Sequence, residues 1–288
     1  MELDQVLLLG SVVLLIAVVA ARLGARLGLP SLILFLGLGV ALSALVYDFE
    51  DANLAHTLGF AALVLILGEG GFTTRWSEIK SALPAAILLA TVGVGVSIAA
   101  VAAFAHLVLG LDLPTAMLLG AITSPTDAAA VFSVLRRVPL PARIRAIIEA
   151  ESGLNDAPIV LLVATATNWA LGTTGEEGPV IIAGSILLEL LGGALLGAVV
   201  GWVGVRALRR IALPAYGLYP LAGLGWAVMA YGLGGWLNLS GFAAVYVTAV
   251  VLGNGELPHR HATRSFAEGV GWIAQIGLFV MLGMLAEP

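Results

Sequence analysis

The sequence contains no cysteine and few charged residues, and each feature excludes certain kinds of protein or site. Without cysteine there is no disulfide framework, no thiolate metal site and no thiol nucleophile. Only 11% of the 288 residues are charged and 60% are hydrophobic, which is far from the composition of a soluble domain. The His-Glu-x-x-His, Gly-rich phosphate-loop and Ser-His-Asp patterns of common enzyme classes are also missing. We therefore expect a membrane protein that is not an enzyme.

Long apolar runs recur along the whole chain, and each can cross a hydrocarbon core of about 30 Å as a helix. The first run follows Glu2 and Asp4 rather than basic residues, so we interpret it as a span and not as a signal peptide. The sequence predicts an all-α polytopic membrane protein with about ten transmembrane helices. Their approximate ranges are 5–21, 30–46, 53–69, 83–109, 113–135, 143–171, 180–205, 215–233, 238–253 and 267–286.

All 13 lysine and arginine residues fall in alternate connections between these spans or, for Arg143 and Arg145, in the first residues of the span that follows. Cytoplasmic loops carry the basic excess, so the basic side faces the cytoplasm and the N-terminus lies outside. One miscounted span would destroy this alternation, and its regularity therefore supports the count of ten. We expect a multi-pass protein of the cell (inner) membrane. The basic residues, connection by connection, are Arg22 and Arg26; Arg75 and Lys80; Arg136, Arg137, Arg143 and Arg145; Arg206, Arg209 and Arg210; Arg260 and Arg264.

The span 113–135 is interrupted by the polar stretch Thr-Ser-Pro-Thr-Asp at residues 123–127. Pro125 cannot donate a backbone hydrogen bond and clashes with the preceding turn, so we expect a discontinuous helix with its break near Pro125. At membrane depth such a break is tolerated where it lines a cavity, and the freed carbonyl groups can then coordinate ions. Alternatively, Pro125 only kinks the helix and Thr126 and Asp127 cap its inner half. The local residues leave both interpretations open.

A second polar stretch, residues 151–156, lies inside the span 143–171. A helix that began after Asp156 would contain 15 residues, roughly 22 Å, which is too short to cross the core. The helix must therefore begin earlier, with Asn155 and Asp156 inside it. By the i, i+4 rule Ser152 and Asp156 share one face, and Glu151 and Asn155 share an adjacent one. Converging hydroxyl and carboxylate oxygens suit a hard cation, although a purely structural role stays open.

Two more acids occupy predicted spans. Glu69 lies at the cytoplasmic end of the span 53–69, where an acid can simply be solvated. Glu189 lies ten residues into the span 180–205, near mid-membrane, and the sequence names no partner for it. Ionisable residues inside spans are costly and usually face a cavity or a partner. For both acids a structural role and a transport role stay open.

Three segments together resemble the monovalent cation/proton antiporters, in particular their electroneutral sodium or potassium/proton exchanger branch. They are Gly-Glu-Gly-Gly at 68–71, followed by a short basic loop, the Thr-Ser-Pro-Thr-Asp stretch at 123–127, and Glu-Ser-Gly-Leu-Asn-Asp at 151–156. The resemblance implies that Asp156 alternately binds the cation and the proton. It also implies that the Ser152 hydroxyl and the Thr126 carbonyl are further oxygen ligands of the monovalent cation, and that Glu69 approaches the ion from a neighbouring span.

The same resemblance assigns three residues to organising the site: Asp127 compensates facing helix ends, Asn155 orders the site, and Glu151 pairs with an arginine of a later helix. No arginine follows Arg264 in this sequence. Family members are built from inverted repeats whose second broken helix and arginine-bearing helix come after this point, and potassium/proton relatives often add a cytosolic tail. We therefore expect residues 1–288 to form a single transmembrane transporter domain, truncated at its C-terminal end.

The expected function is secondary active exchange of Na+ or K+ for H+. Removing a carboxyl group from water disfavours its charged form, so a proton and a cation can compete for Asp156 at cytoplasmic pH. Asn155 in place of a second acid indicates one proton per cation and hence an electroneutral cycle. A cation channel that uses the same acids and a non-transporting membrane scaffold are the alternatives. We expect no cofactor, a homodimer in the lipid bilayer, and no nucleic-acid partner.

Overall fold

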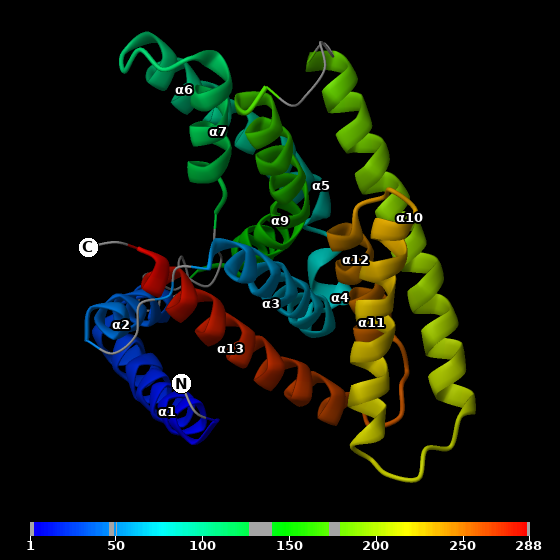
Figure 1. Ribbon diagram of the computed structural model, residues 1–288. Coiled ribbons are helices and arrows are strands. Elements are labelled where there is room, and N and C mark those ends of the chain that lie inside the picture. Colours follow the sequence, from blue (N-terminus) through cyan, green and yellow to red (C-terminus); the bar gives the residue numbers. More distant parts are fainter. Residues whose placement is uncertain (1–2, 46–48, 50, 127–139, 173–178, 287–288) are drawn as a thin grey trace. The chain divides into compact units, whose positions relative to one another are not determined.

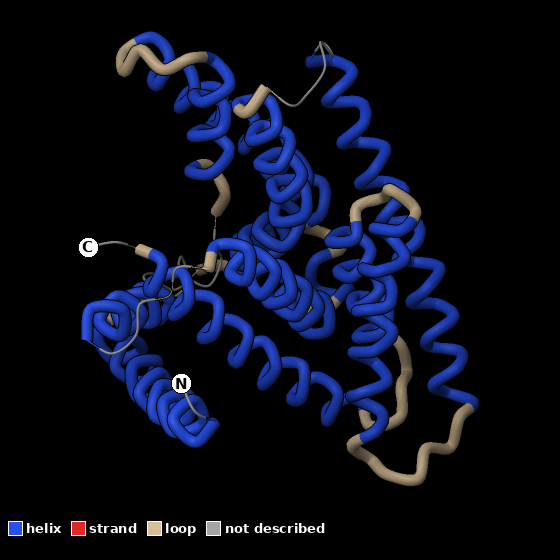
Figure 2. The backbone as a smooth tube through the Cα atoms, viewed as in Figure 1, coloured by secondary structure: helices blue, strands red, loops and turns tan. Residues whose placement is uncertain are grey.

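The computed structural model consists of helices and connecting loops, with no strand among the residues that it describes (Figure 2). Those residues are 3–45, 49, 51–126, 140–172 and 179–286. They divide into two compact units: the first contains residues up to Ile66 and from Glu268 onward, and the second contains Leu67 to Thr126 and Leu140 to Ala267. The expected all-helical fold is confirmed for this part of the chain.

Several helices have the length and composition needed to cross a membrane. Many of their large apolar side chains, such as Leu8 and Leu15, are exposed on the helix surface, as expected where lipid is the solvent. Shorter apolar helices are α2 (Ser31–Leu45), α7 (Leu113–Thr123) and α12 (Gly241–Asn254). The five long apolar segments in the described part are α1 (Leu3–Leu27), α3 (Ala52–Thr73), Leu83–Leu107, Gly184–Arg210 within α10 (Pro179–Arg210), and α13 (Arg260–Leu285).

Each predicted span coincides with helix over at least part of its range, but the count of ten spans stays a prediction. Five of the ten predicted spans are not among the five long apolar segments: those at the shorter helices α2, α7 and α12, and those at α9 (Ala142–Ala170) and α11 (Leu218–Trp236). In the span 113–135, α7 ends at Thr123 and residues 124–126 are not helical. The remainder of that span lies outside the described residues, so the discontinuous helix also stays a prediction.

Several helix ends differ from the predicted ranges, for physical reasons. α3 continues through two glycines to Thr73 because Gly71 packs against backbone: a Cβ added there would lie 2.6 Å from the Tyr246 carbonyl oxygen of α12. α10 continues to Arg210, and basic residues in a last helical turn interact favourably with its dipole. The segment Leu83–Leu107 consists of α5 (Leu83–Leu88), a π-helical turn η1 (Leu89–Gly93) and α6 (Val94–Leu107).

In the first unit α1 and α2 pack with the part of α13 that begins at Glu268. Gly39 of α2 and Gly283 of α13 bring the two backbones together, since a Cβ added at either would lie within 3 Å of the other's Cα, at 2.8 and 2.9 Å. Small residues allow such close approach between membrane helices. The apolar core of this unit consists of Ala17, Phe35, Ile276 and Val280.

The second unit is organised around α12, which packs against α10 and α11 (Figure 1). A Cβ added at Gly197 of α10 would lie 2.5 Å from the Ala244 carbonyl oxygen, and the Thr248 hydroxyl donates a hydrogen bond to the Gly197 carbonyl at 3.0 Å. Ser240 caps the start of α12 by accepting a hydrogen bond from the Ala243 amide. α12 is therefore held backbone to backbone, with little room to shift.

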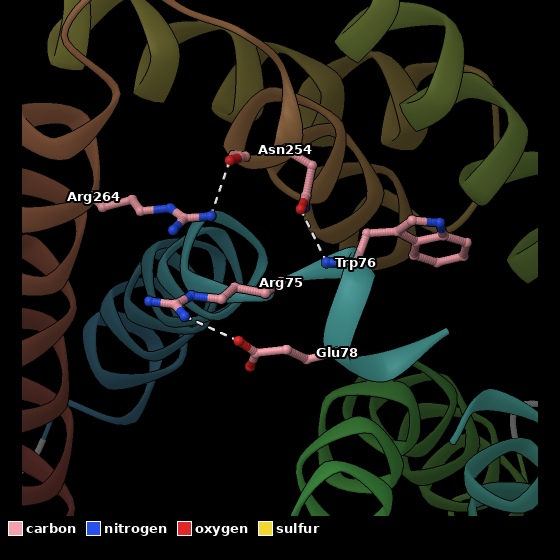
Figure 3. A network of polar contacts seen from close by, with 6 residues as sticks. Arg75, Trp76, Glu78, Asn254 and Arg264 are labelled. Carbon is pink, nitrogen blue, oxygen red and sulfur yellow. Dashed lines mark hydrogen bonds and ion pairs between the residues drawn. The ribbon is translucent and has the colours of Figure 1, made fainter. Parts of the chain in front are cut away.

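At its other end α12 is tied to α4 (Trp76–Ile79) by the side chain of Asn254 (Figure 3). The Asn254 amide nitrogen donates to the Thr74 carbonyl at 2.9 Å, and its oxygen accepts from the Trp76 amide at 2.9 Å. The Gly253 carbonyl accepts from two arginine side chains of α13, where their charge suits the C-terminal end of a helix dipole. Those arginines are Arg260, at 2.9 Å, and Arg264, at 3.1 Å.

The Asn254 link leads to a prediction about stability. Asn254→Ala leaves the Thr74 carbonyl and the Trp76 amide without their partner, and we expect it to lower the free energy of unfolding by about 1–3 kcal/mol. Thermal unfolding of the purified protein in detergent measures the change. Asn53→Ala, at an exposed position in the first turn of α3, is the matched control and should unfold like the wild type. Equal unfolding temperatures for the two variants would contradict the role of Asn254.

Candidate functional site

The candidate site is built on α9, whose middle carries residues 151–156. The helix is continuous from Ala142 to Ala170 with Pro158 inside it, so the prediction that it begins well before Asp156 is confirmed. Pro158 has no N–H to donate to the carbonyl of Leu154, one turn earlier. The polar stretch therefore lies inside a long helix, next to a point where the helical hydrogen bonding is interrupted.

Thr126, just beyond the end of α7, meets this stretch through both its side chain and its backbone. Its hydroxyl donates to the Glu151 carboxylate at 2.7 Å, and its carbonyl accepts from the Ser152 hydroxyl at 3.1 Å. The Asn155 amide nitrogen donates to the Thr126 hydroxyl at 3.1 Å and to Glu151 at 3.0 Å. The structure thus brings together four of the residues that the sequence singled out: Thr126, Glu151, Ser152 and Asn155.

This network is almost completely removed from solvent on the α9 side. Glu151 and Ser152 are 8% exposed and Asn155 is 0% exposed. In the described residues the partners of the Glu151 carboxylate are the neutral side chains of Thr126 and Asn155. An ionised carboxylate only accepts hydrogen bonds, and two converging donors stabilise its charge. Because the carboxylate can only accept, the Asn155 side chain must be oriented with its NH₂ group toward Glu151.

Within the described part of the chain, two buried oxygen atoms in this region have no hydrogen-bond partner: the hydroxyl of Ser124, at the end of α7, and the amide oxygen of Asn155. Leaving such groups unpaired costs about 1–3 kcal/mol each, and they are rare unless they serve a ligand. All of the offered groups are oxygens, which suit a hard cation. Among the described residues there is no group of three or more His, Cys, Asp or Glu that could hold a resident metal ion.

Of the three other predicted site residues, two lie in the described part of the chain. Asp156 is half-buried on α9, directly after Asn155 and one turn beyond Ser152. Glu69 is half-buried within α3, whose last turns pack against α12. Asp127 lies outside the described residues. The predicted roles of Asp156 and Glu69 at the ion stay predictions.

Sequence reasoning missed two features of the site. It named the carbonyl of Thr126 but not the hydroxyl, which joins Glu151 to Asn155. It also missed Tyr246 of α12: a Cβ added at Gly153 would lie 2.8 Å from the Tyr246 hydroxyl oxygen. A glycine in the middle of a polar stretch indicates that another group approaches the backbone closely. The sequence could not say which group that is.

The chain is similar to known proteins of one family along most of its length. Residues 11–288 match the family described as "Sodium/hydrogen exchanger, transmembrane". The K(+)/H(+) antiporter NhaP2 of Shewanella oneidensis is 32% identical over 293 residues, which cover 100% of this chain and 50% of the relative. The K(+)/H(+) antiporter NhaP of Alkalimonas amylolytica is 34% identical over 288 residues, which cover 96% of this chain and 49% of the relative. The chain therefore spans about half the length of these curated relatives.

Among solved structures the fold is similar to that of the sodium proton antiporter MjNhaP1 from Methanocaldococcus jannaschii. The TM-score is 0.80 at 23% sequence identity, and the match covers 100% of this chain and 71% of the other. A structural similarity at 23% identity shows the fold alone. The family is shown by the family match, which extends over nearly the whole sequence. This chain belongs to the transmembrane sodium/hydrogen exchanger family, a family of monovalent cation/proton antiporters.

Proposed function

We propose that this protein is a secondary active antiporter that exchanges Na+ or K+ for H+ across the cell (inner) membrane, with Asp156 as the exchanging carboxylate. One observation carries the proposal: the Ser152 hydroxyl and the Thr126 carbonyl, from two different elements, meet at 3.1 Å one turn before Asp156 on α9. Membership of the exchanger family and the names of its relatives support it.

The spacing of these two oxygens suits a dehydrated cation. Hard cations such as Ca²⁺ take oxygen ligands at roughly 2.3–2.6 Å, and two such ligands at right angles lie about 3.3–3.7 Å apart. Ser152 and Thr126 are thus within a few tenths of an ångström of a chelating pair. The unpaired oxygens of Asn155 and Ser124 offer further acceptors nearby, and Asp156 supplies the negative charge.

The exchange follows from competition for one carboxylate. When Asp156 carries a proton, its carboxyl group is neutral and does not attract a cation. When a cation is bound, it occupies the carboxylate oxygens and prevents the proton from binding. Asn155 is neutral and already bonded to Thr126 and Glu151, so it adds no second exchangeable charge. One proton then leaves for each monovalent cation that enters, which makes the cycle electroneutral.

The proposal includes the arrangement around this site. The N-terminus lies outside and the basic connections lie in the cytoplasm, as the charge alternation predicts. Glu69 approaches the cation from α3, and Asp127 compensates the helix ends at the break near Pro125. Two copies of the protein assemble as a homodimer.

Reconstituted vesicles with an internal pH probe test the function. With an acidic interior, addition of Na+ or K+ should restore the internal pH, at a rate that does not change when the membrane potential is clamped at zero or imposed with either sign. Cation flux without proton movement would instead identify a channel. A response to membrane potential alone would contradict electroneutral exchange, and vesicles with no response to any of the three alkali ions Li+, Na+ and K+ would support the scaffold alternative.

A further inference from the structure

Tyr246 of α12 lies with the tip of its ring against α9 at Gly153. A Cβ added at Gly153 would lie 2.8 Å from the Tyr246 hydroxyl oxygen, 3.3 Å from Cζ and 3.5 Å from Cε2. The hydroxyl is therefore the part of the tyrosine that comes nearest, and only glycine leaves space for it. A polar group from a third element thus reaches the middle of the polar stretch 151–156.

The helical geometry of α9 places Asp156 next to this hydroxyl. Successive residues of an α-helix are about 100° apart, so Asp156 lies about 60° around the helix from Gly153, and Ser152 about 100° in the same direction. Helical side chains also lean toward the N-terminal turn, which for Asp156 is the turn of Ser152 and Gly153. We therefore expect the Asp156 carboxyl group to lie between two residues from other elements. Thr126, bonded to Ser152, is on one side, and Tyr246, packed on Gly153, is on the other.

Tyr246 is also carried by a rigid element. Its helix is held against α10 at Gly197, where the backbones are in contact, and the Tyr246 carbonyl itself packs against Gly71 at the end of α3. Functional groups on firmly packed helices keep their positions more accurately than groups on loops. The Tyr246 hydroxyl is thus held in position by a firmly packed helix, on the side of α12 that faces α9.

We propose that the Tyr246 hydroxyl oxygen is a further ligand of the transported monovalent cation, on the opposite side of Asp156 from Thr126. This inference rests on the proposed exchange at Asp156. A phenol is neutral at physiological pH and offers two oxygen lone pairs, as a serine hydroxyl does. It completes the ring of oxygens around the cation without adding charge, so the charge count of the exchange cycle is unchanged. Of the acids described above, Asp156 and Glu151 lie on the same stretch of α9 as Gly153.

Tyr246→Phe removes this one oxygen and keeps the ring. At fixed pH we expect the KM for the alkali cation to rise about tenfold, which corresponds to roughly 1.4 kcal/mol of lost binding, while kcat stays within about twofold. Tyr231→Phe, on α11 where the ring packs edge-on against Phe242, is the matched control and should leave both constants unchanged. The cation-dependent rise in unfolding temperature of the purified protein should weaken in parallel for Tyr246→Phe alone.

A second variant tests the geometry separately from transport. Gly153→Ala places a methyl group against the Tyr246 hydroxyl and should lower the unfolding temperature, and Tyr246→Phe in the same chain should recover part of that loss because the nearest atom is gone. Additive effects would show that the two residues do not touch.

The possible outcomes separate the inference from the proposed function. Unchanged KM values in Tyr246→Phe, or a fall in kcat alone, would overturn the role of Tyr246 as a ligand while exchange by the wild type stands. If instead the wild type shows no exchange, or Asp156→Asn retains it, the proposed function itself fails, whatever Tyr246 does.

Discussion

Asp156→Asn is expected to abolish cation-dependent proton exchange, with rates falling about 100-fold or more, to those of vesicles without protein. Asparagine has almost the same size and shape as aspartate, but it can neither lose a proton nor carry the negative charge that holds a cation. Both competing occupants of the site therefore lose their binding group at once. Because asparagine fills the same space, unfolding in detergent should occur within a few degrees of the wild-type temperature.

The measurement is recovery of the internal pH in reconstituted vesicles after addition of Na+ or K+, at equal amounts of protein in the membrane. Asp4→Asn, which neutralises an exposed acid in the first turn of α1, is the matched control and should transport at the wild-type rate. Exchange that persists in Asp156→Asn would exclude this carboxylate as the exchanging group. Glu69 and Glu151 would then be the remaining candidates.

Gly197→Ala should strongly destabilise the packing of α10 against α12. The added methyl group would lie 2.5 Å from the Ala244 carbonyl oxygen and 3.0 Å from its Cα, and neither backbone atom can move aside without separating α10 from α12. Separation would also lengthen the hydrogen bond from Thr248 to the Gly197 carbonyl. We expect overpacking and the weakened bond together to lower the free energy of unfolding by about 3 kcal/mol.

Gly184→Ala on the same helix supplies the control. Nothing lies within 4 Å of a Cβ added at Gly184, so alanine there should be neutral or should stabilise α10 by up to about 1 kcal/mol through its higher helix propensity. Unfolding temperatures of the two variants in the same detergent should therefore move in opposite directions. Equal shifts would mean that the contact between α10 and α12 does not limit stability.

Much of the helical organisation was predictable because the bilayer imposes it: a run of apolar residues long enough to cross lipid has to be a helix. The ends of helices were less predictable, since they depend on packing. The sequence predicts a loop at Gly70 and Gly71, but α3 continues, and Gly71 packs against the backbone of α12. Likewise, Arg209 and Arg210 read as a connection yet form the last turn of α10.

For the candidate site, spacing along one helix was sufficient to predict which side chains of α9 lie together. The bond between Asn155 and Glu151 follows from the i, i+4 rule. Contacts between elements could not be derived in this way. The Thr126 hydroxyl and the phenol of Tyr246 reach α9 from 25 residues before Glu151 and from another helix altogether, and no local pattern encodes either approach.

The buried carboxylate of Glu151 has a consequence for the sign of the ion that the site accepts. It receives two hydrogen bonds and faces no basic group among the described residues, so no positive charge there offsets an ionised Glu151. An ionised Glu151 would therefore add negative potential at the proposed ion site, beyond that of Asp156. Under the proposed exchange, this potential would repel chloride and other anions and would attract an alkali ion.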